Sequence, residues 1–515
     1  MASSINIPKT HLIMGLCLPL AVVLGYLLAE PLDSASLAVV VFVLVILAVP
    51  LMMKWHHPLL IVSWNAVIAP AFLPGHPLLW MLMAVASLLF GVLNRSVNPD
   101  RRFIVIPSVT KSLLFLSAVV VGTAFLTGGL GFRSMGSSTY GGRNYAYIAA
   151  AVLGYFAFSS QRIPKERAGL FLALFFLPGL TGMASNLIYM AGPSFYSLFD
   201  FFPVENAMEQ ASADASPTRY FGRIYGFAIA SPALYCYVLA RYGIRGSCDV
   251  TKPWRGLLLL AAASGCIVSG FRSTLILFAL TFCAAFYLEG LHRTRLLAVA
   301  AGLTLASAAA VLPLADKLPL EVQRTLSFLP INVDPIIKRS ATDSTNWRLQ
   351  MWKDVLPQVP TYLLKGKGYA LDPNAMYWAA VSTAHSFGPG YVGTIFAGDY
   401  HNGPLSVIMP FGIWGAIGFV WFLAASLRYL YGNYRLGDPQ LKQINTCLLA
   451  AFAAKVLFFT FVFGSFQNDL YFFAGLMGFS VSLNGELAAQ VAEERTAEDE
   501  EALEALFYKN GRDAA

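Results

Sequence analysis

A histidine stands where the chain returns from a long polar segment into an apolar one, within Gly398-Asp399-Tyr400-His401-Asn402-Gly403-Pro404-Leu405. The ordinary pKa of histidine, about 6.5, lets His401 accept a proton at neutral pH. Asn402 adds a hydrogen-bonding side chain, and Asp399 is a carboxylate close enough in sequence to orient the imidazole. These residue types suit general-base chemistry, although a histidine at a membrane interface can also be a hydrogen-bonded residue in contact with water.

Three arginines border apolar segments and favour an anionic ligand. Arg272 lies in a short break between two such segments, and Arg219 and Arg223 precede another. A guanidinium this close to hydrocarbon is costly unless it meets a polar cavity or a counter-charge. No acidic residue lies near Arg272 in sequence, so its partner is another segment, a lipid headgroup or a substrate phosphate. Because arginine contacts phosphate oxygens in bidentate fashion, we expect Arg219 and Arg223 to form one cationic pocket with Arg272, with snorkelling to headgroups as the alternative.

The elements that must position these residues are membrane helices. Of the 515 residues, 57% are hydrophobic and 12% are charged, and the mean hydropathy is +0.61, which is far from the balance of soluble domains. We therefore predict an all-α polytopic membrane protein with about 14 (12–14) transmembrane helices. The apolar runs are 12–29, 35–53, 58–74, 76–93, 104–127, 144–159, 168–190, 222–240, 255–270, 273–289, 295–311, 403–427, 443–463 and 468–485.

The distribution of basic residues predicts which loops face the cytoplasm. Connections on one side contain 17 Lys and Arg, whereas the short connections on the other contain Arg133, Arg143, Arg219, Arg223 and Arg272. Cytoplasmic loops accumulate basic residues, so both termini are predicted to be cytoplasmic and His401 to lie on the outer face. The net charge of +7 is explained by loops beside anionic membrane lipids, without nucleic acid as a partner.

These patterns divide the chain into four parts. We predict an N-terminal transmembrane bundle at 1–311, a large outer loop at 312–402, C-terminal transmembrane helices at 403–486 and an acidic cytoplasmic tail at 487–515, which has eight acidic and three basic residues.

Within the large loop, residues 345–356 have the pattern of a short amphipathic helix. Leu349, Trp352 and Leu356 share one face, Thr345 can cap the start and Pro357 ends the helix. Such a helix either lies on the bilayer or roofs the bundle.

In its motifs and their order, the chain resembles the O-antigen ligase and O-antigen polymerase family of bacterial envelope glycosyltransferases. His401-Asn402 with Leu405 and then Gly412-Ile413-Trp414-Gly415 is similar to that family's histidine motif. The other similar motifs are Arg348 with Trp352, Gly366-Lys367-Gly368, Ser269-Gly270-Phe271-Arg272, and Gly222-Arg223 with Gly226. Two local departures, at Ala230-Ser231-Pro232-Ala233 and Phe271, and the larger number of predicted spans concern the subfamily and the acceptor.

The resemblance implies a periplasmic active site in a bacterial inner-membrane enzyme. It would transfer a glycan from an undecaprenyl-diphosphate carrier to a hydroxyl of a lipid or glycan acceptor, with inversion and with no metal or other cofactor. His401 would be the general base and Arg223 and Arg272 would bind the diphosphate. Arg348, Asn402 and Arg219 are further candidates for substrate contact.

Other readings remain open. A polymerase would join lipid-linked repeat units to each other, whereas a ligase would move a finished chain to another carrier, and nothing in the sequence separates the two. A polysaccharide or lipid transporter would use charges near the bilayer midplane, for which Lys455 is the best candidate. A metal site built from His385, Asp399 and His401 fits by residue type but not by spacing.

Overall fold

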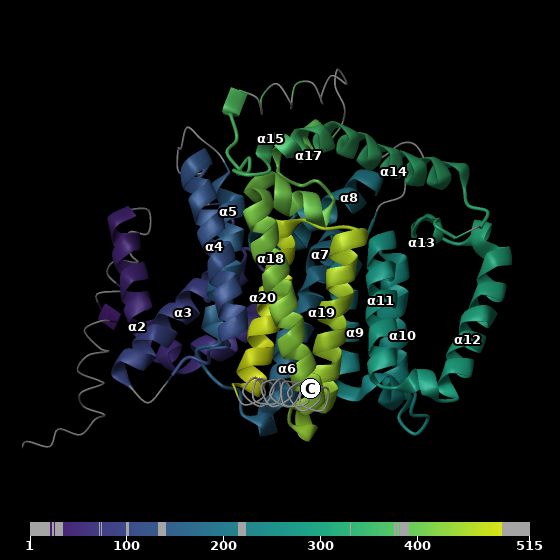
Figure 1. The fold of residues 1–515 in the computed structure, drawn as a ribbon, viewed down its shortest axis with the longest axis horizontal. Coiled ribbons are helices and arrows are strands. Elements are labelled where there is room, and N and C mark those ends of the chain that lie inside the picture. Colours follow the sequence, from purple (N-terminus) through teal and green to yellow (C-terminus); the bar gives the residue numbers. More distant parts are fainter. Residues whose placement is uncertain are drawn as a thin grey trace, which may run out of the picture. The chain divides into compact units, whose positions relative to one another are not determined.

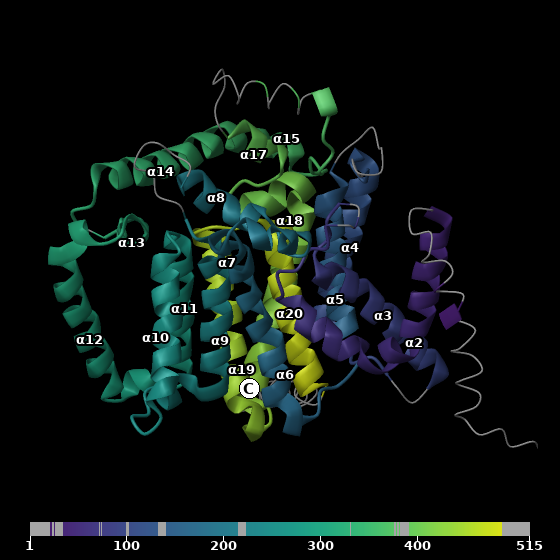
Figure 2. The same cartoon turned by 180° about the vertical axis from the view of Figure 1, so that it is seen from behind.

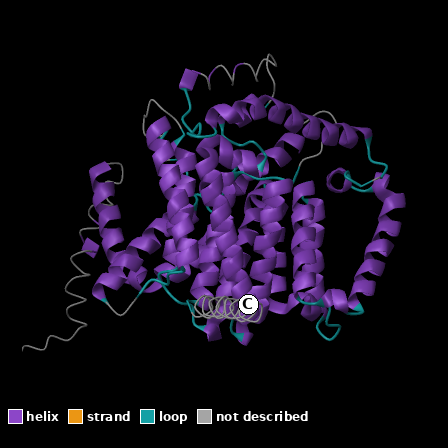
Figure 3. Cartoon of the chain, in the orientation of Figure 1, coloured by secondary structure: helices purple, strands orange, loops and turns teal. Residues whose placement is uncertain are grey.

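The structure is a computed structural model that describes residues 21, 22, 25, 34–71, 73, 75–98, 102–131, 141–214, 223–329, 331–374, 377, 381 and 391–486. The described residues form helices and loops with no β-strand, which confirms the predicted all-α class (Figure 3). The chain divides into two compact units at residues 1–56 and 57–515, and the candidate site belongs to the second. The predicted first span at 12–29 and the acidic tail at 487–515 lie largely or wholly outside the described residues.

The helices follow the apolar runs closely through most of the chain. Their bounds are α2 Ser34–Trp64, α3 Leu79–Val97, α4 Pro107–Thr127, α5 Gly142–Phe158, α6 Ala168–Phe176, α7 Ala184–Ala191, α8 Glu205–Asp214, α9 Tyr225–Ser247, α10 Pro253–Val268, α11 Arg272–Leu288, α12 Leu296–Val311, α13 Leu320–Leu326, α14 Pro335–Val355, α15 Val359–Tyr362, α17 Val392–Phe396, α18 Gly403–Leu436, α19 Lys442–Phe461 and α20 Phe466–Asn484.

Six stretches of the described chain are long and apolar enough to cross a membrane. They are Leu79–Val97, Pro107–Thr127, Lys165–Ala191, Tyr225–Ser247, Gly403–Leu436 and Pro439–Phe461. Three apolar helices, α10, α11 and α12, are shorter. The predicted count of about 14 is therefore not confirmed, although the long helices do run side by side as a bundle (Figures 1 and 2).

The predicted span at 58–74 is wrong. Helix α2 continues from the preceding run and ends at Trp64, and the described residues at 65–71, 73 and 75–78 are irregular. Pro70 and Pro77 explain the difference, because proline lacks a backbone N–H and clashes with the preceding helical turn. The segment bonds instead to a distant loop, since the backbone N–H groups of Ala69 and Ala71 donate to Phe201 and Asp200 at 2.8 and 2.7 Å.

The amphipathic helix of the large loop is longer than predicted. Helix α14 starts at Pro335, where the Asp334 side chain accepts from the N–H of Ile336, so Thr345 is not its cap. Its buried side chains are Ile337, Ala341, Met351 and Val355, whereas Leu349 and Leu356 are exposed. The predicted apolar face is therefore wrong at these two leucines, whereas its third residue, Trp352, packs beside the buried side chains of α14. The helix lies across one end of the bundle, as the roof alternative predicted (Figure 1).

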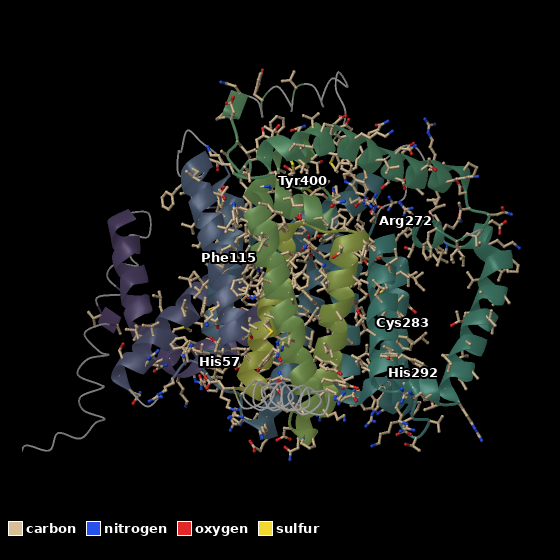
Figure 4. All side chains as sticks on the ribbon, in the orientation of Figure 1. His57, Phe115, Arg272, Cys283, His292 and Tyr400 are labelled. Carbon is tan, nitrogen blue, oxygen red and sulfur yellow. The ribbon has the colours of Figure 1, made fainter. Side chains whose placement is uncertain are left out.

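The loops of the second unit gather at the two ends of the bundle. At one end, Ile104 bonds to Ser159, Ile244 bonds to Glu289 and Lys165 pairs with Asp438. These contacts join connections that the basic-residue count assigned to one side. Figure 4 places Arg272 and Tyr400 at the opposite end from His57 and His292. The arrangement agrees with the predicted alternation of loops in this unit and leaves the compartment on each side as a prediction.

Candidate active site

His401 lies in a strained loop directly before α18. Its φ is +48°, a left-handed conformation that is uncommon for residues with a side chain. The Asp399 Oδ1 accepts from the His401 backbone N–H at 3.2 Å, and the Asn402 Oδ1 caps α18 by accepting from the N–H of Leu405 at 3.0 Å. Both neighbours singled out in the sequence thus hold the backbone that presents the imidazole.

The His401 imidazole lies between two aromatic rings. Its centroid is 5.2 Å from the Trp347 ring on α14 and 5.0 Å from the Phe463 ring between α19 and α20. Its buried Nδ1 has no hydrogen-bond partner among the described residues, because the Asp399 Oδ1 is 3.8 Å away. Burial lowers the pKa of His401, the Asp399 carboxylate opposes that shift, and the Arg348 cation reinforces it.

Arg348 connects the histidine with the other arginines. Its guanidinium carbon is 5.7 Å from the centroid of the Phe463 ring, the same ring that contacts His401. Burial lowers the pKa of Arg348, the positive charges of Arg272 and Arg223 lower it further, and Asp399 acts in the opposite direction. The positive charges of Arg223 and Arg272 therefore act on Arg348 at the end of the bundle that contains His401.

A tight turn between α10 and α11 positions Arg272. Gly270 has a φ of +77°, and a Cβ there would lie 3.3 Å from the Arg223 side chain. The N–H of Ile224 donates to the Ser269 carbonyl at 3.2 Å, and the buried Arg324 donates from Nη1 to the Gly270 carbonyl at 3.0 Å. Glycine therefore allows the segment that carries Arg223 to pack against the turn that carries Arg272.

Arg223 and Arg272 differ in their surroundings. The Arg223 Nε is 3.2 Å from Glu209 Oε1 on α8, and its guanidinium carbon is 5.1 Å from the Phe271 ring centroid. Arg272 approaches the Ala341 carbonyl on α14 at 3.5 Å, which is a weak hydrogen bond. Arg223 thus has an acidic partner from another segment, and the ion pair for Arg272 that the sequence left open has no counterpart among the ion pairs of the described residues. Arg219 lies outside the described residues.

The Gly366-Lys367-Gly368 motif anchors the roof to a kink in α18. The N–H groups of Lys367 and Gly368 donate to the carbonyls of Met409 and Pro410 at 2.8 and 2.9 Å. A Cβ at Gly366, where φ is +77°, would lie 2.2 Å from the Pro410 carbonyl oxygen. The motif needs glycine because the backbone is left-handed and the partner backbone leaves no room.

A second small core holds α14 over the site. Met351 and Val355 pack with Tyr400 and Leu405, and the Trp352 Nε1 donates to the Tyr400 carbonyl at 2.9 Å. The helix that carries Arg348 is thereby fixed to the residue that precedes His401.

The cavity beside His401 is small. Its volume is about 20 Å³, and it is lined by Trp352, His401, Asn402, Gly403, Phe459, Thr460, Phe461, Val462 and Phe463. This volume has room for about one water molecule and not for a glycan. Arg223, Arg272 and Arg348 do not line the cavity.

Sequence reasoning brought Arg223, Arg272, Arg348 and His401 to one end of the molecule, and it missed the groups that contact them. Phe463 lies in a Phe-Gly-Ser turn between two apolar runs, and Glu209 is an acid in a long outer loop. The sequence shows both residues, but it does not indicate which side chains they contact.

Two other readings of the sequence meet the structure here. The part of the chain that is described contains no group of three or more His, Cys, Asp or Glu able to hold a metal ion, and His385 lies outside that part. Lys455, the candidate transport charge, is 2.6 Å from Asp469 Oδ1, so a neighbouring span neutralises it.

Fold and site together define an all-helical membrane protein with a histidine and several arginines under a roof helix. Residues 257–420, less than half of the chain, match the family model described as O-antigen ligase, the family that the motifs resemble. That family consists of glycosyltransferase-type enzymes. The matched region contains Arg272, Arg348 and His401, while Arg223 precedes it. A comparison with curated proteins finds no match.

Proposed function

We propose that this protein transfers a glycan from an undecaprenyl-diphosphate carrier to an acceptor hydroxyl at the periplasmic face of the bacterial inner membrane. The observation that carries the proposal is the meeting of His401 with Arg348 across the Phe463 ring, with Arg272 and Arg223 close enough to act on the Arg348 charge. The family match agrees with this reaction class.

His401 is the proposed general base. A sugar hydroxyl is a poor nucleophile at neutral pH, and a neutral imidazole within hydrogen-bond reach can remove its proton during attack. Because burial lowers the pKa of His401, the imidazole is neutral and ready to accept a proton at pH 7. Since Nδ1 faces Asp399, Nε2 is the atom assigned to the acceptor, and the Asp399 carboxylate stabilises the imidazolium that forms.

Arg272 and Arg348 are the proposed principal contacts of the diphosphate, with Arg223 beside them. The bond from the anomeric carbon to the diphosphate oxygen breaks as the acceptor oxygen attacks from the opposite side, so the configuration inverts. Negative charge grows on the leaving diphosphate, and fixed guanidinium groups stabilise it. Arg223 is the weaker contact because Glu209 already shares its charge.

The direct test uses purified protein in lipid nanodiscs. Undecaprenyl-diphosphate glycan and a candidate acceptor should give transferred glycan and undecaprenyl diphosphate, and EDTA should not reduce the rate. A product in which repeat units are joined on the carrier would assign the polymerase reaction, whereas a product on a separate lipid acceptor would assign the ligase reaction. Failure to release undecaprenyl diphosphate with any acceptor would contradict both.

A further inference from the structure

The loop at 462–465, between α19 and α20, contacts both groups that the proposed reaction uses. Phe463 places its ring centroid 5.0 Å from the His401 ring and 5.7 Å from the Arg348 guanidinium carbon. It lies outside the region that matches the family model. Phe463 therefore packs against both groups, and it shares the imidazole with Trp347.

The loop is tied to the start of α18, two residues beyond His401. A Cβ at Gly464 would lie 2.6 Å from the Cα of Gly403, so the two backbones are in close contact. The N–H of Phe466 donates to the Ser406 Oγ at 3.0 Å. A shift of the loop would thus be felt directly at the histidine.

A buried ion pair between α19 and α20 is bonded to the backbone of this loop. The Lys455 Nζ of α19 is 2.6 Å from Asp469 Oδ1 of α20, and their side chains are 12% and 10% exposed. The second carboxylate oxygen of Asp469 accepts from the N–H of Ser465 at 2.8 Å. One carboxylate therefore binds the neighbouring helix and the loop backbone together.

A buried ion pair is not explained by stability alone. Burying two charges beside hydrocarbon costs desolvation free energy, and apolar residues of similar size often serve stability as well or better. One oxygen of the Asp469 carboxylate pairs with Lys455, and the other accepts from the backbone of the loop. This division indicates that the pair positions the loop.

We propose that Lys455 and Asp469 are positioning residues, whose ion pair holds the 462–465 loop so that Phe463 stays packed against His401 and Arg348. The catalytic consequence rests on the proposed function, whereas the packing consequence does not. Without the pair the Ser465 N–H loses its acceptor, the loop moves away from α18, and water reaches the imidazole.

This account predicts the direction in which the His401 pKa changes. The charged groups that face the imidazole are Asp399 from its own loop and Arg348 from α14, and the substitutions leave both in place. Burial is the largest cause of the lowered pKa, so hydration should raise it toward its ordinary value.

The test measures that pKa without requiring turnover. In the full-length protein with labelled histidine, NMR titration would follow the His401 signal, assigned by its loss in His401→Gln. The double variant Lys455→Met with Asp469→Ala removes both charges and should raise the pKa, as Phe463→Leu should. Lys455→Arg keeps an ion pair and should leave the pKa near the native value.

A matched ion pair at the other end of the bundle supplies the control. Lys165 pairs with Asp438 there, and Lys165→Met should leave the His401 pKa unchanged. If the double variant does not fold, Lys455→Met with Asp469→Leu, which fills the space of the carboxylate without offering an acceptor to the Ser465 N–H, replaces it. A folded variant of either kind with an unchanged His401 pKa would overturn the proposal, whatever the outcome of the transfer assay.

Where transfer is measurable, turnover gives a second readout. The double variant should lose about 10- to 100-fold in kcat through misplacement of the base, and the acid limb of its pH profile should move to higher pH. Adding Phe463→Leu to the double variant should cause little further loss, because both changes act through the same ring. Fully multiplicative losses would contradict the shared route.

Discussion

The two ends of the helix bundle differ in how their buried charges are arranged. At the end with the short basic loops, Asn445 and Asn484 donate to each other at 2.9 and 3.0 Å, and Glu289 accepts from the Ile244 N–H at 2.9 Å. At the other end, the buried His401 Nδ1 lacks a hydrogen-bond partner among the described residues, and burial with like charges lowers the pKa of Arg348.

This difference between the two ends indicates which end has the functional site. Like charges brought together in a buried place shift one another's pKa values, and such shifted groups concentrate at functional sites. Orphaned atoms alone do not separate the two ends, because the buried Arg255 Nε, His292 Nδ1 and Asn433 Oδ1 at the end with the short basic loops also lack hydrogen-bond partners among the described residues. The end with His401 keeps positive charge and a hydrogen-bonding atom in reserve, which suits an anionic lipid-linked donor.

The largest expected effect comes from removing the proposed base. His401→Ala should lower kcat by about 10²- to 10⁴-fold, because general-base catalysis is lost, while donor binding is retained. His76→Ala is a matched control, since His76 shares the left-handed backbone with a φ of +47° and is exposed. A folded His401→Ala protein with native turnover would refute the base assignment.

Removing a guanidinium should come next. Arg272→Ala and Arg348→Ala should each reduce kcat/KM by about 10²- to 10³-fold, because a fixed donor to the developing phosphate charge is lost. The lysine variants keep the charge without the bidentate fork and should recover part of the rate. Arg435→Ala, an exposed change at the other end, should have no effect, and equal effects of Arg272→Ala and Arg435→Ala would remove the distinction between the ends.

The pH profile should report the burial of the histidine. Only the neutral imidazole acts as a base, and burial lowers the pKa of His401, so kcat should hold below pH 6.5 and fall only as the pH drops through the lowered value. Because the pKa of His401 is lower in the folded protein than in the unfolded chain, the unfolded chain binds this proton more readily. The contribution of His401 to the free energy of unfolding is therefore lost as the pH falls below about 6.5. An acid limb at or above pH 6.5 in the native protein would contradict the buried environment.

The smallest expected effect is at Arg223. Glu209→Gln removes the carboxylate that shares its charge and should lower KM for the donor by at most about fivefold, since a partly exposed ion pair contributes little. The value of kcat should stay the same. A large fall in kcat would show instead that Glu209 takes part in the reaction.

Sequence patterns could predict the all-helical bundle, the placement of the arginines and His401 at one end of it, and the resemblance to the O-antigen ligase family. Long apolar runs indicate helices, although they did not give the end of α2 or a confirmed number of spans, and alternation of their loops brings distant residues to one end. Prolines could have corrected the span at 58–74, and the Asp334-Pro335 pair is a recognisable helix start that could have extended α14.

The contacts within the site could not be predicted in the same way. Phe463 reaches His401, and Glu209 reaches Arg223, only because helices pack in a particular rotation, and an apolar helix has no strong sequence signal for that rotation. Lys455 illustrates the limit: its partner Asp469 belongs to the next span, and nothing in the spacing of the two residues required their side chains to meet.

The most direct test of the central claim is a cryo-EM structure of the His401→Gln protein with undecaprenyl-diphosphate glycan in nanodiscs. We expect the diphosphate within hydrogen-bond distance of Arg272 and Arg348, with the first sugar beside residue 401. Density for the diphosphate at the other end of the bundle, or a first sugar remote from residue 401, would contradict the account.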